Sequence, residues 1–112
     1  MPVDSLFQSA LRRTKLPLEN PGPAVVDEDG AMAVFSIRTS GDMICWVEYR
    51  CTTCATLVAC CEALRLAVGG ITTGAALQLA AADLAALVPG VPEARWSRLS
   101  IAVRALHAAV AA

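Results

Sequence analysis

Two cysteines separated by two threonines, Cys51 and Cys54, carry the clearest chemistry that this sequence offers. Cys54 stands where an extended run of residues stops and a helical pattern begins. The N-terminus of a helix favours the thiolate form of a cysteine, and the thiolate is the form that binds a metal ion or attacks sulfur. We therefore expect Cys54 to be the reactive residue of the chain.

The other cysteines fit better as packing residues. A Cys-x-x-Cys pair also occurs in zinc knuckles and redox motifs, but a zinc site needs a second such pair and a redox motif has its first cysteine at the helix start. Cys51 is expected on the inner face of a strand, as a small buried side chain. Cys61 lies within an apolar stripe, and Cys45 and Cys60 are expected at or near the core. His107 flanks the apolar stripe of the last helix, where packing or surface exposure is expected rather than ligation.

Two extended runs should form a β-hairpin ahead of Cys54. Residues 31–38 and 43–51 are rich in strand-forming side chains, and residues 39–42, with the sequence Thr-Ser-Gly-Asp, suit a turn. Side chains alternate between the two faces of a strand. One face of the second run is therefore expected to lie under helices, and it carries Met43, Cys45, Val47, Tyr49 and Cys51.

A helical period follows from Cys54 to the pair Gly69-Gly70, which should stop the helix. A last helix is predicted from Arg95, and shorter helices are predicted over residues 4–15, 73–79 and 82–87. Strands that come first and helices that follow predict an α+β fold, with an antiparallel sheet and helices packed on one face. We divide the chain into an N-terminal helix with a proline-rich linker, residues 1–23, and one domain, residues 24–112.

Composition narrows the classes of function and partner. Nine basic and ten acidic residues nearly cancel, so neither a nucleic-acid footprint nor a basic membrane patch is visible. No run is long and apolar enough to predict a membrane span, and the N-terminus has no secretory pattern, so a cytoplasmic protein with reduced thiols is expected. Charge is sparse after Gly69, which favours a homo-oligomer.

The sequence around Cys54 resembles the NifU/IscU-type iron–sulfur cluster scaffolds. Residues 47–59, Val-Glu-Tyr-Arg-Cys-Thr-Thr-Cys-Ala-Thr-Leu-Val-Ala, are similar to the strand and Gly-Cys-Gly helix start of that family, and Cys54 falls on its middle cysteine ligand. The likeness continues with little change of spacing through residues 64–70, 73–77, 83–85 and 99–109. The resemblance implies the SufE/IscU fold over roughly residues 30–112.

The family's cluster is held by three cysteines and an aspartate, and this chain departs from that set. By the resemblance, Asp27 and Asp29 stand where the Cys-x-Asp segment should be, and Arg95-Trp96 stands where the family has His-Cys. The ligands that remain are Cys54, Asp29, Asp27 and Cys51, a mixture that suits an iron or zinc ion better than a stable cluster, with a labile iron–sulfur cluster as the other cargo. An arginine near the thiol, Arg95, is similar to the SufE-type sulfur acceptors.

These observations predict an iron–sulfur assembly protein rather than an enzyme, either a divergent scaffold or a carrier of sulfur or metal centred on Cys54. Its implied partners are a cysteine desulfurase or other iron–sulfur assembly proteins. Two alternatives stay open: a relative that binds no cluster and acts as a protein-binding adaptor, and a SufE-like persulfide acceptor. A thiol enzyme using Cys51 and Cys54 ranks last, because no general base is placed by the sequence.

Overall fold

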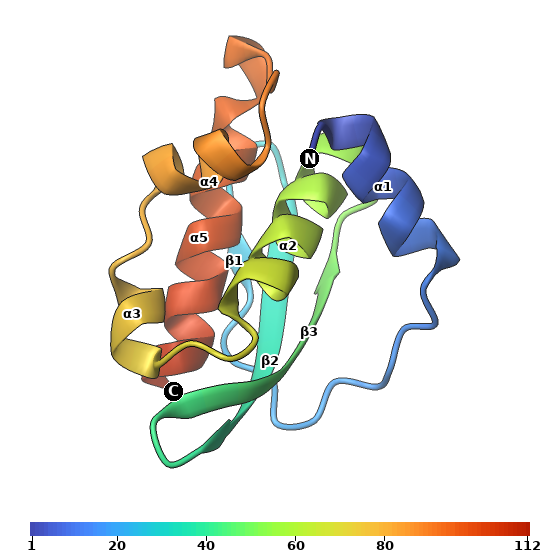
Figure 1. Cartoon of the computed structure of the whole chain (residues 1–112). Coiled ribbons are helices and arrows are strands. Elements are labelled where there is room, and N and C mark those ends of the chain that lie inside the picture. Colours follow the sequence, from blue (N-terminus) through green and yellow to red (C-terminus); the bar gives the residue numbers. More distant parts are fainter.

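A three-stranded antiparallel sheet forms the base of the fold, and the helices gather on one of its faces (Figure 1). The computed structural model describes all residues, 1–112, and its strands lie in the order β1 (Val25–Val26), β2 (Met32–Ser40) and β3 (Met43–Cys51). The helices are α1 (Val3–Arg12), α2 (Ala55–Val68), α3 (Thr73–Leu77), α4 (Ala81–Leu87) and α5 (Trp96–Ala111), with a 3-10 turn, η1 (Glu93–Arg95), leading into α5. The predicted α+β fold is confirmed.

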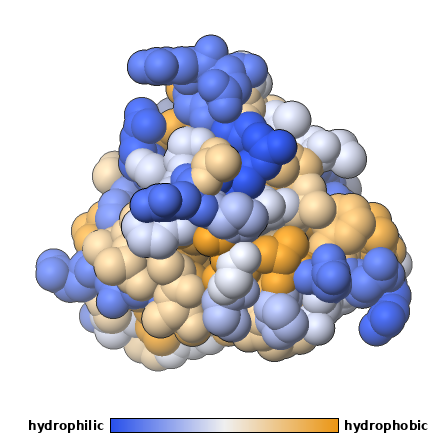
Figure 2. Space-filling model, turned by 90° about the horizontal axis from the view of Figure 1, so that it is seen from above, coloured by the Kyte–Doolittle hydropathy of each residue, from blue (hydrophilic) through white to orange (hydrophobic).

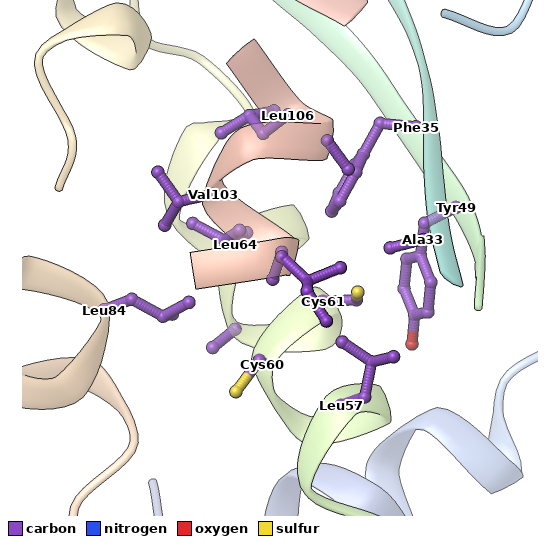
Figure 3. Close-up of a cluster of buried hydrophobic side chains, with 14 of the residues drawn as sticks. Ala33, Phe35, Tyr49, Leu57, Cys60, Cys61, Leu64, Leu84, Val103 and Leu106 are labelled. Carbon is purple, nitrogen blue, oxygen red and sulfur yellow. The ribbon is translucent and has the colours of Figure 1, made fainter. Parts of the chain in front are cut away.

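Helices α2 and α5 supply the side chains that cover the sheet (Figure 3). The core between these layers contains Phe35 and Tyr49 from the sheet, Leu57 and Leu64 from α2, and Leu106 from α5, all fully buried. Helices α3 and α4 pack against α5, and α1 packs against α2. None of the helices combines the length and hydrophobicity that a bilayer crossing requires.

Strand β3 contains a bulge that changes which of its residues face the core. Arg38 pairs with Trp46 and Thr39 pairs with Ile44, so Cys45 is an extra residue without a partner on β2. The alternation therefore resets at this point, which buries Ile44 and leaves Met43 and Cys45 exposed. The expectation that Met43 and Cys45 lie under the helices was wrong, because period-two alternation holds only while the ladder is regular.

The proline-rich segment packs on the rest of the chain rather than extending away from it. The hydroxyl of Ser36 donates a hydrogen bond to the carbonyl of Glu19, and the amide of Gly22 donates to the carbonyl of Phe35 over 2.9 Å. Gly22 also lies against α5, where a Cβ atom would stand 2.5 Å from the Cα of Ala109. The close approach of this segment to α5 therefore requires glycine at position 22.

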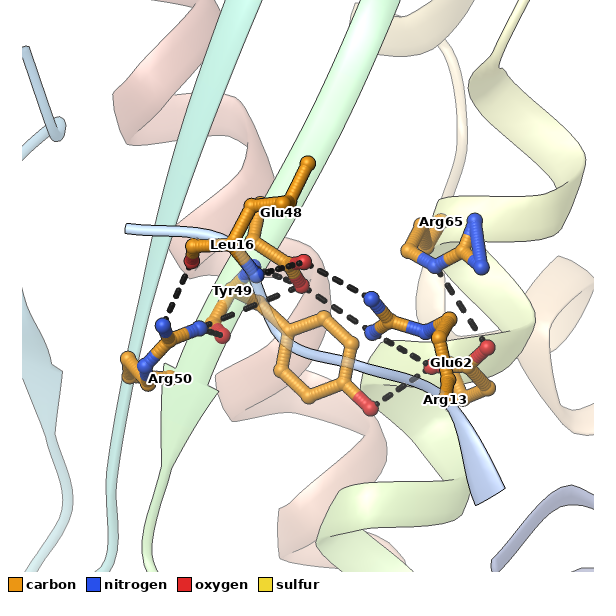
Figure 4. A network of polar contacts seen from close by, with 7 residues as sticks. All are labelled: Arg13, Leu16, Glu48, Tyr49, Arg50, Glu62 and Arg65. Atoms are coloured by element: carbon orange, nitrogen blue, oxygen red, sulfur yellow. Dashed lines mark hydrogen bonds and ion pairs between the residues drawn. The ribbon is translucent and has the colours of Figure 1, made fainter. Parts of the chain in front are cut away.

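Arg13 fastens the N-terminal segment to the sheet and to α2 (Figure 4). Its guanidinium donates two hydrogen bonds to the carboxylate of Glu48, over 2.7 and 3.0 Å, and one to the carboxylate of Glu62, over 3.0 Å. The hydroxyl of Tyr49 donates to the same Glu62 over 2.8 Å. The Glu48 and Glu62 side chains are only 2% and 0% exposed, and Arg13 is the cation that binds both of these buried carboxylates.

The substitution Gly22→Ala should destabilise the protein by about 1–3 kcal/mol, because the added methyl group meets the backbone of α5. The matched control is Gly74→Ala in α3, where the new Cβ would find its nearest neighbour 4.0 Å away. That change should leave the stability unchanged or raise it by up to about 1 kcal/mol. Urea denaturation measures both, and equal effects would show that Gly22 is not needed for this approach.

The substitution Arg13→Met should lower the free energy of unfolding at neutral pH by about 3 kcal/mol, because it removes the one cation that is hydrogen-bonded to both buried carboxylates. Arg12→Met, one residue earlier and exposed, should change it by less than about 0.5 kcal/mol. Denaturation of both variants checks this, and a loss of the same size in each would contradict the role given to Arg13.

The wild-type protein should lose stability in acid through Glu48. Burial alone would raise the pKa of Glu48, but hydrogen bonds from Arg13 and from the amides of Tyr49 and Leu16 outweigh it and lower the pKa below its ordinary value of 4.5. Because the pKa of Glu48 is lower in the folded state than in the unfolded state, ionised Glu48 stabilises the fold at neutral pH. This contribution is lost as the pH falls below about 4.5. Denaturation at several pH values should show that the free energy of unfolding falls less steeply with decreasing pH in Arg13→Met than in the wild type. An unchanged slope would contradict the role of Glu48 in the acid sensitivity.

Candidate functional site

Cys54 lies at the junction between β3 and α2, at the end of the molecule that is uppermost in Figure 1. It is the N-cap residue of α2, with extended backbone angles (φ −135°, ψ 123°), and its carbonyl accepts the first helical hydrogen bond, from Val58 over 2.8 Å. The residue is half-buried, so its sulfur is held at a helix start and is still reachable from solvent. The structure thus has the strand-to-helix junction that the sequence predicted.

The surroundings of Cys54 favour its thiolate. Burial raises the pKa of the thiol, but the amide groups of Leu57 and Thr56 and the guanidinium of Arg98 together lower it below the ordinary value of 9.0. The sulfur makes no regular capping hydrogen bond to α2, so these groups act as nearby positive dipoles and charge. Cys54 is therefore a thiol whose negative form is stabilised from two sides, by the start of α2 and by α5.

Arg98 is held in place by two carboxylates from the segment between β1 and β2. Its Nη1 atom donates to Asp27 over 3.0 Å and to Asp29 over 3.1 Å, and its side chain is only 9% exposed. Asp27 in turn accepts hydrogen bonds from the amides of Asp29 and Ala31, over 2.9 and 3.1 Å, which fixes its own orientation. The cation beside Cys54 thus has a rigid, charged support.

The predicted site residues are brought together differently from what the resemblance implied. Arg95 lies exposed in η1, and the guanidinium beside Cys54 is that of Arg98, about one helical turn further along. Asp27 and Asp29 do reach this end of the molecule, but their carboxylates bind Arg98. Local spacing could not choose between the two arginines, although Arg98 borders Leu99 in the apolar stripe of α5, and this position was a usable signal.

Cys51 interacts with a different partner from the one its spacing suggested. Contact with the thiol of Cys61 lowers the pKa of Cys51. Cys61 is fully buried in α2, and burial raises its pKa well above the ordinary value. The Cys51-x-x-Cys54 spacing therefore does not by itself identify a metal-binding or redox pair here.

The four predicted ligands do not fit a metal ion or an iron–sulfur cluster. No group of three or more histidine, cysteine, aspartate or glutamate side chains converges in a way that could hold a metal ion. The carboxylates of Asp27 and Asp29 are bound by Arg98, whose positive charge would also repel a cation beside Cys54. The predicted ligand set of Cys54, Asp29, Asp27 and Cys51 is therefore not assembled.

The remaining thiols differ from Cys54 in exposure or acidity. Cys45 is exposed on the β3 bulge, and its thiol donates to the carbonyl of Arg38 over 3.4 Å. Cys60 is fully buried, as predicted, and burial together with the neighbouring Cys54 and Cys51 raises its pKa to about 12. Cys54 alone combines access from solvent with a contact to a supported cation.

Comparison with known proteins gives the fold and no function. No family model matches the chain, and no curated protein matches it. A crystal structure of a protein described as hypothetical superposes with a TM-score of 0.71 at 17% sequence identity, over 98% of this chain and 97% of that one. Such a likeness shows the shared fold, and the resemblance to the NifU/IscU scaffolds stays a prediction.

Arg98→Gln should raise the pKa of Cys54 and lower its alkylation rate at pH 7 by roughly tenfold, because a nearby guanidinium accounts for part of the thiolate stabilisation. Arg95→Gln is the matched control and should leave the rate unchanged. Timed alkylation with mass mapping separates Cys54 from the exposed Cys45 in each sample. If Arg95→Gln slowed Cys54 as much as Arg98→Gln, the assignment of the cation would be wrong.

Proposed function

We propose that this protein is a sulfur carrier related to the iron–sulfur assembly proteins, which accepts a sulfur atom at Cys54 as a persulfide. One observation carries the proposal: a single accessible thiol has its thiolate stabilised by Arg98, while no set of metal ligands surrounds it. The resemblance of residues 47–59 to the NifU/IscU helix start supports the kinship. The fold is compatible with this role but does not select it.

The transfer needs only the thiolate of Cys54 and a persulfide donor. The Cys54 thiolate attacks the outer sulfur of a donor persulfide, R–S–SH, and forms a new S–S bond as the bond within the donor breaks. The electron pair of the broken bond leaves on the donor as R–S⁻, and the proton stays on the transferred sulfur. Atoms and charge balance, and no external oxidant or reductant is consumed.

Arg98 has a function at both stages of this reaction. Before transfer its charge keeps Cys54 as the nucleophilic thiolate. After transfer the negative charge of a deprotonated persulfide lies one sulfur further out, within the field of the same guanidinium. Because Asp27 and Asp29 hold Arg98, the cation does not have to be reorganised between the two states.

The surface around the thiol suits a protein donor such as a cysteine desulfurase. Seen from above, hydrophobic residues lie exposed near the centre of this face, with hydrophilic residues around them (Figure 2). Val26, next to Asp27, is 57% exposed, and Trp96, two residues before Arg98, is 54% exposed. The indole of Trp96 donates to the carbonyl of Val91 over 3.0 Å, so this aromatic side chain is fixed before any partner binds.

The same surface favours a second candidate, an adaptor that binds its partner without using the thiol. Val26 and Trp96 are exposed, and the hydrogen bond of the Trp96 indole is to Val91 and not to Cys54. The two functions differ in what Cys54 contributes. In the carrier Cys54 is essential for sulfur loading, whereas in the adaptor partner binding is unaffected by its loss.

Incubation with glutathione persulfide in the absence of oxygen should add the mass of one sulfur atom at Cys54. Cys54→Ser should abolish the added mass, and Cys45→Ser should retain it, because Cys45 is exposed but has no guanidinium partner. Peptide mass mapping after alkylation locates the sulfur. Loading that is equal at Cys45 and Cys54, or absent at both, would rule out the carrier and leave the adaptor.

A further inference from the structure

A cavity that does not include Cys54 lies between the end of α2 and strand β3. Its volume is about 360 Å³, within the range of pockets that hold small organic ligands. The side chains that matter for its chemistry are those of Arg65 from α2, Trp46 and Val47 from β3, and Leu16 from the N-terminal segment, with Cys45 at the bulge. The proposed sulfur carrier makes no use of this cavity.

Arg65 is a half-buried cation with unused donors. Its Nε atom lies 3.4 Å from the buried carboxylate of Glu62, and its side chain is 24% exposed. Figure 4 shows its two terminal nitrogens turned away from Glu62, and neither makes a hydrogen bond or ion pair within the protein. The Nε contact with Glu62 is an ion pair without a hydrogen bond, and a guanidinium with both terminal nitrogens free offers the planar fork that pairs with a carboxylate.

The charges beneath the cavity are nearly balanced, with a positive excess. Arg13, Arg50 and Arg65 contact two carboxylates, those of Glu48 and Glu62. The Glu48 carboxylate already accepts hydrogen bonds from Arg13 and from the amides of Leu16 and Tyr49. Of these groups Arg13, Arg65 and Glu48 line the cavity itself, so two cations and one carboxylate face it, and the free donors belong to Arg65.

The rest of the lining includes apolar and aromatic side chains. The indole of Trp46 is half-buried, and the guanidinium of Arg38 stacks on it with 4.7 Å to the ring centroid, which restrains the ring. Val47 and Leu16 add aliphatic surface. A site with one positive fork and one hydrophobic wall selects a ligand with an anionic end and an apolar body.

We propose that this cavity binds a small organic carboxylate, with the carboxylate on Arg65 and an apolar or aromatic body against Trp46. Phenylacetate is a suitable probe, and phenylacetamide is the matched neutral compound of the same shape. In a Trp96→Phe background Trp46 is the only tryptophan, so its fluorescence reports on this cavity alone. Phenylacetate should give a saturable change at millimolar concentrations, and the amide should bind at least about tenfold more weakly.

Arg65→Gln in the same background should weaken phenylacetate binding by about tenfold, while Arg104→Gln, an exposed arginine on α5, should not. In the wild-type protein phenylacetate should also slow alkylation of Cys45, at the cavity, and leave Cys54 unaffected. The acid–amide comparison needs no variant at Arg65, so it decides the question even if Arg65→Gln does not fold. No saturable change, equal binding of the amide, or equal protection of both cysteines would overturn the proposal.

Discussion

The candidate site depends on one buried cation, the guanidinium of Arg98. It contacts the segment before β2 through Asp27 and Asp29, and it lies beside Cys54 at the start of α2. A guanidinium with a 9% exposed side chain costs free energy unless it is paired, so the two carboxylates are a condition for its presence. The same charge gives the site its chemistry, because it stabilises a thiolate and repels a metal ion at the same point.

A second charged cluster joins other segments of the chain, and it too pairs an arginine with two carboxylates. Arg13 stands between Glu48 and Glu62, and through them it joins the N-terminal segment to β3 and α2. Residues 1–23, predicted as a helix and linker outside the domain, are thereby packed onto it. Arg65 lines the cavity beside this cluster. It contacts Glu62 only through its Nε atom, so its two terminal nitrogens stay free.

Regular elements could be predicted from the sequence, whereas contacts between distant segments could not. The hairpin, α2 and α5 follow from hydrophobic period, and the short α3 was predicted near its observed place, where Thr72 caps it by accepting from the amide of Ala75 over 3.0 Å. The β3 bulge was missed because one inserted residue leaves no local mark. Arg98 was missed because its partner Asp27 is 71 residues away in sequence, and only the packing of α5 brings them together.

The ionisation of Cys54 in the intact protein tests the central claim most directly. Carbon NMR of protein labelled at the cysteine Cβ atoms resolves each thiol through a pH titration, with no substitution in the core. Cys54 should titrate below 9.0, and Cys60 should titrate far above it, at about 12. A Cys54 titration at or above 9.0 would contradict the account, because the charge of Arg98 would then not stabilise the thiolate on which the proposed sulfur transfer depends.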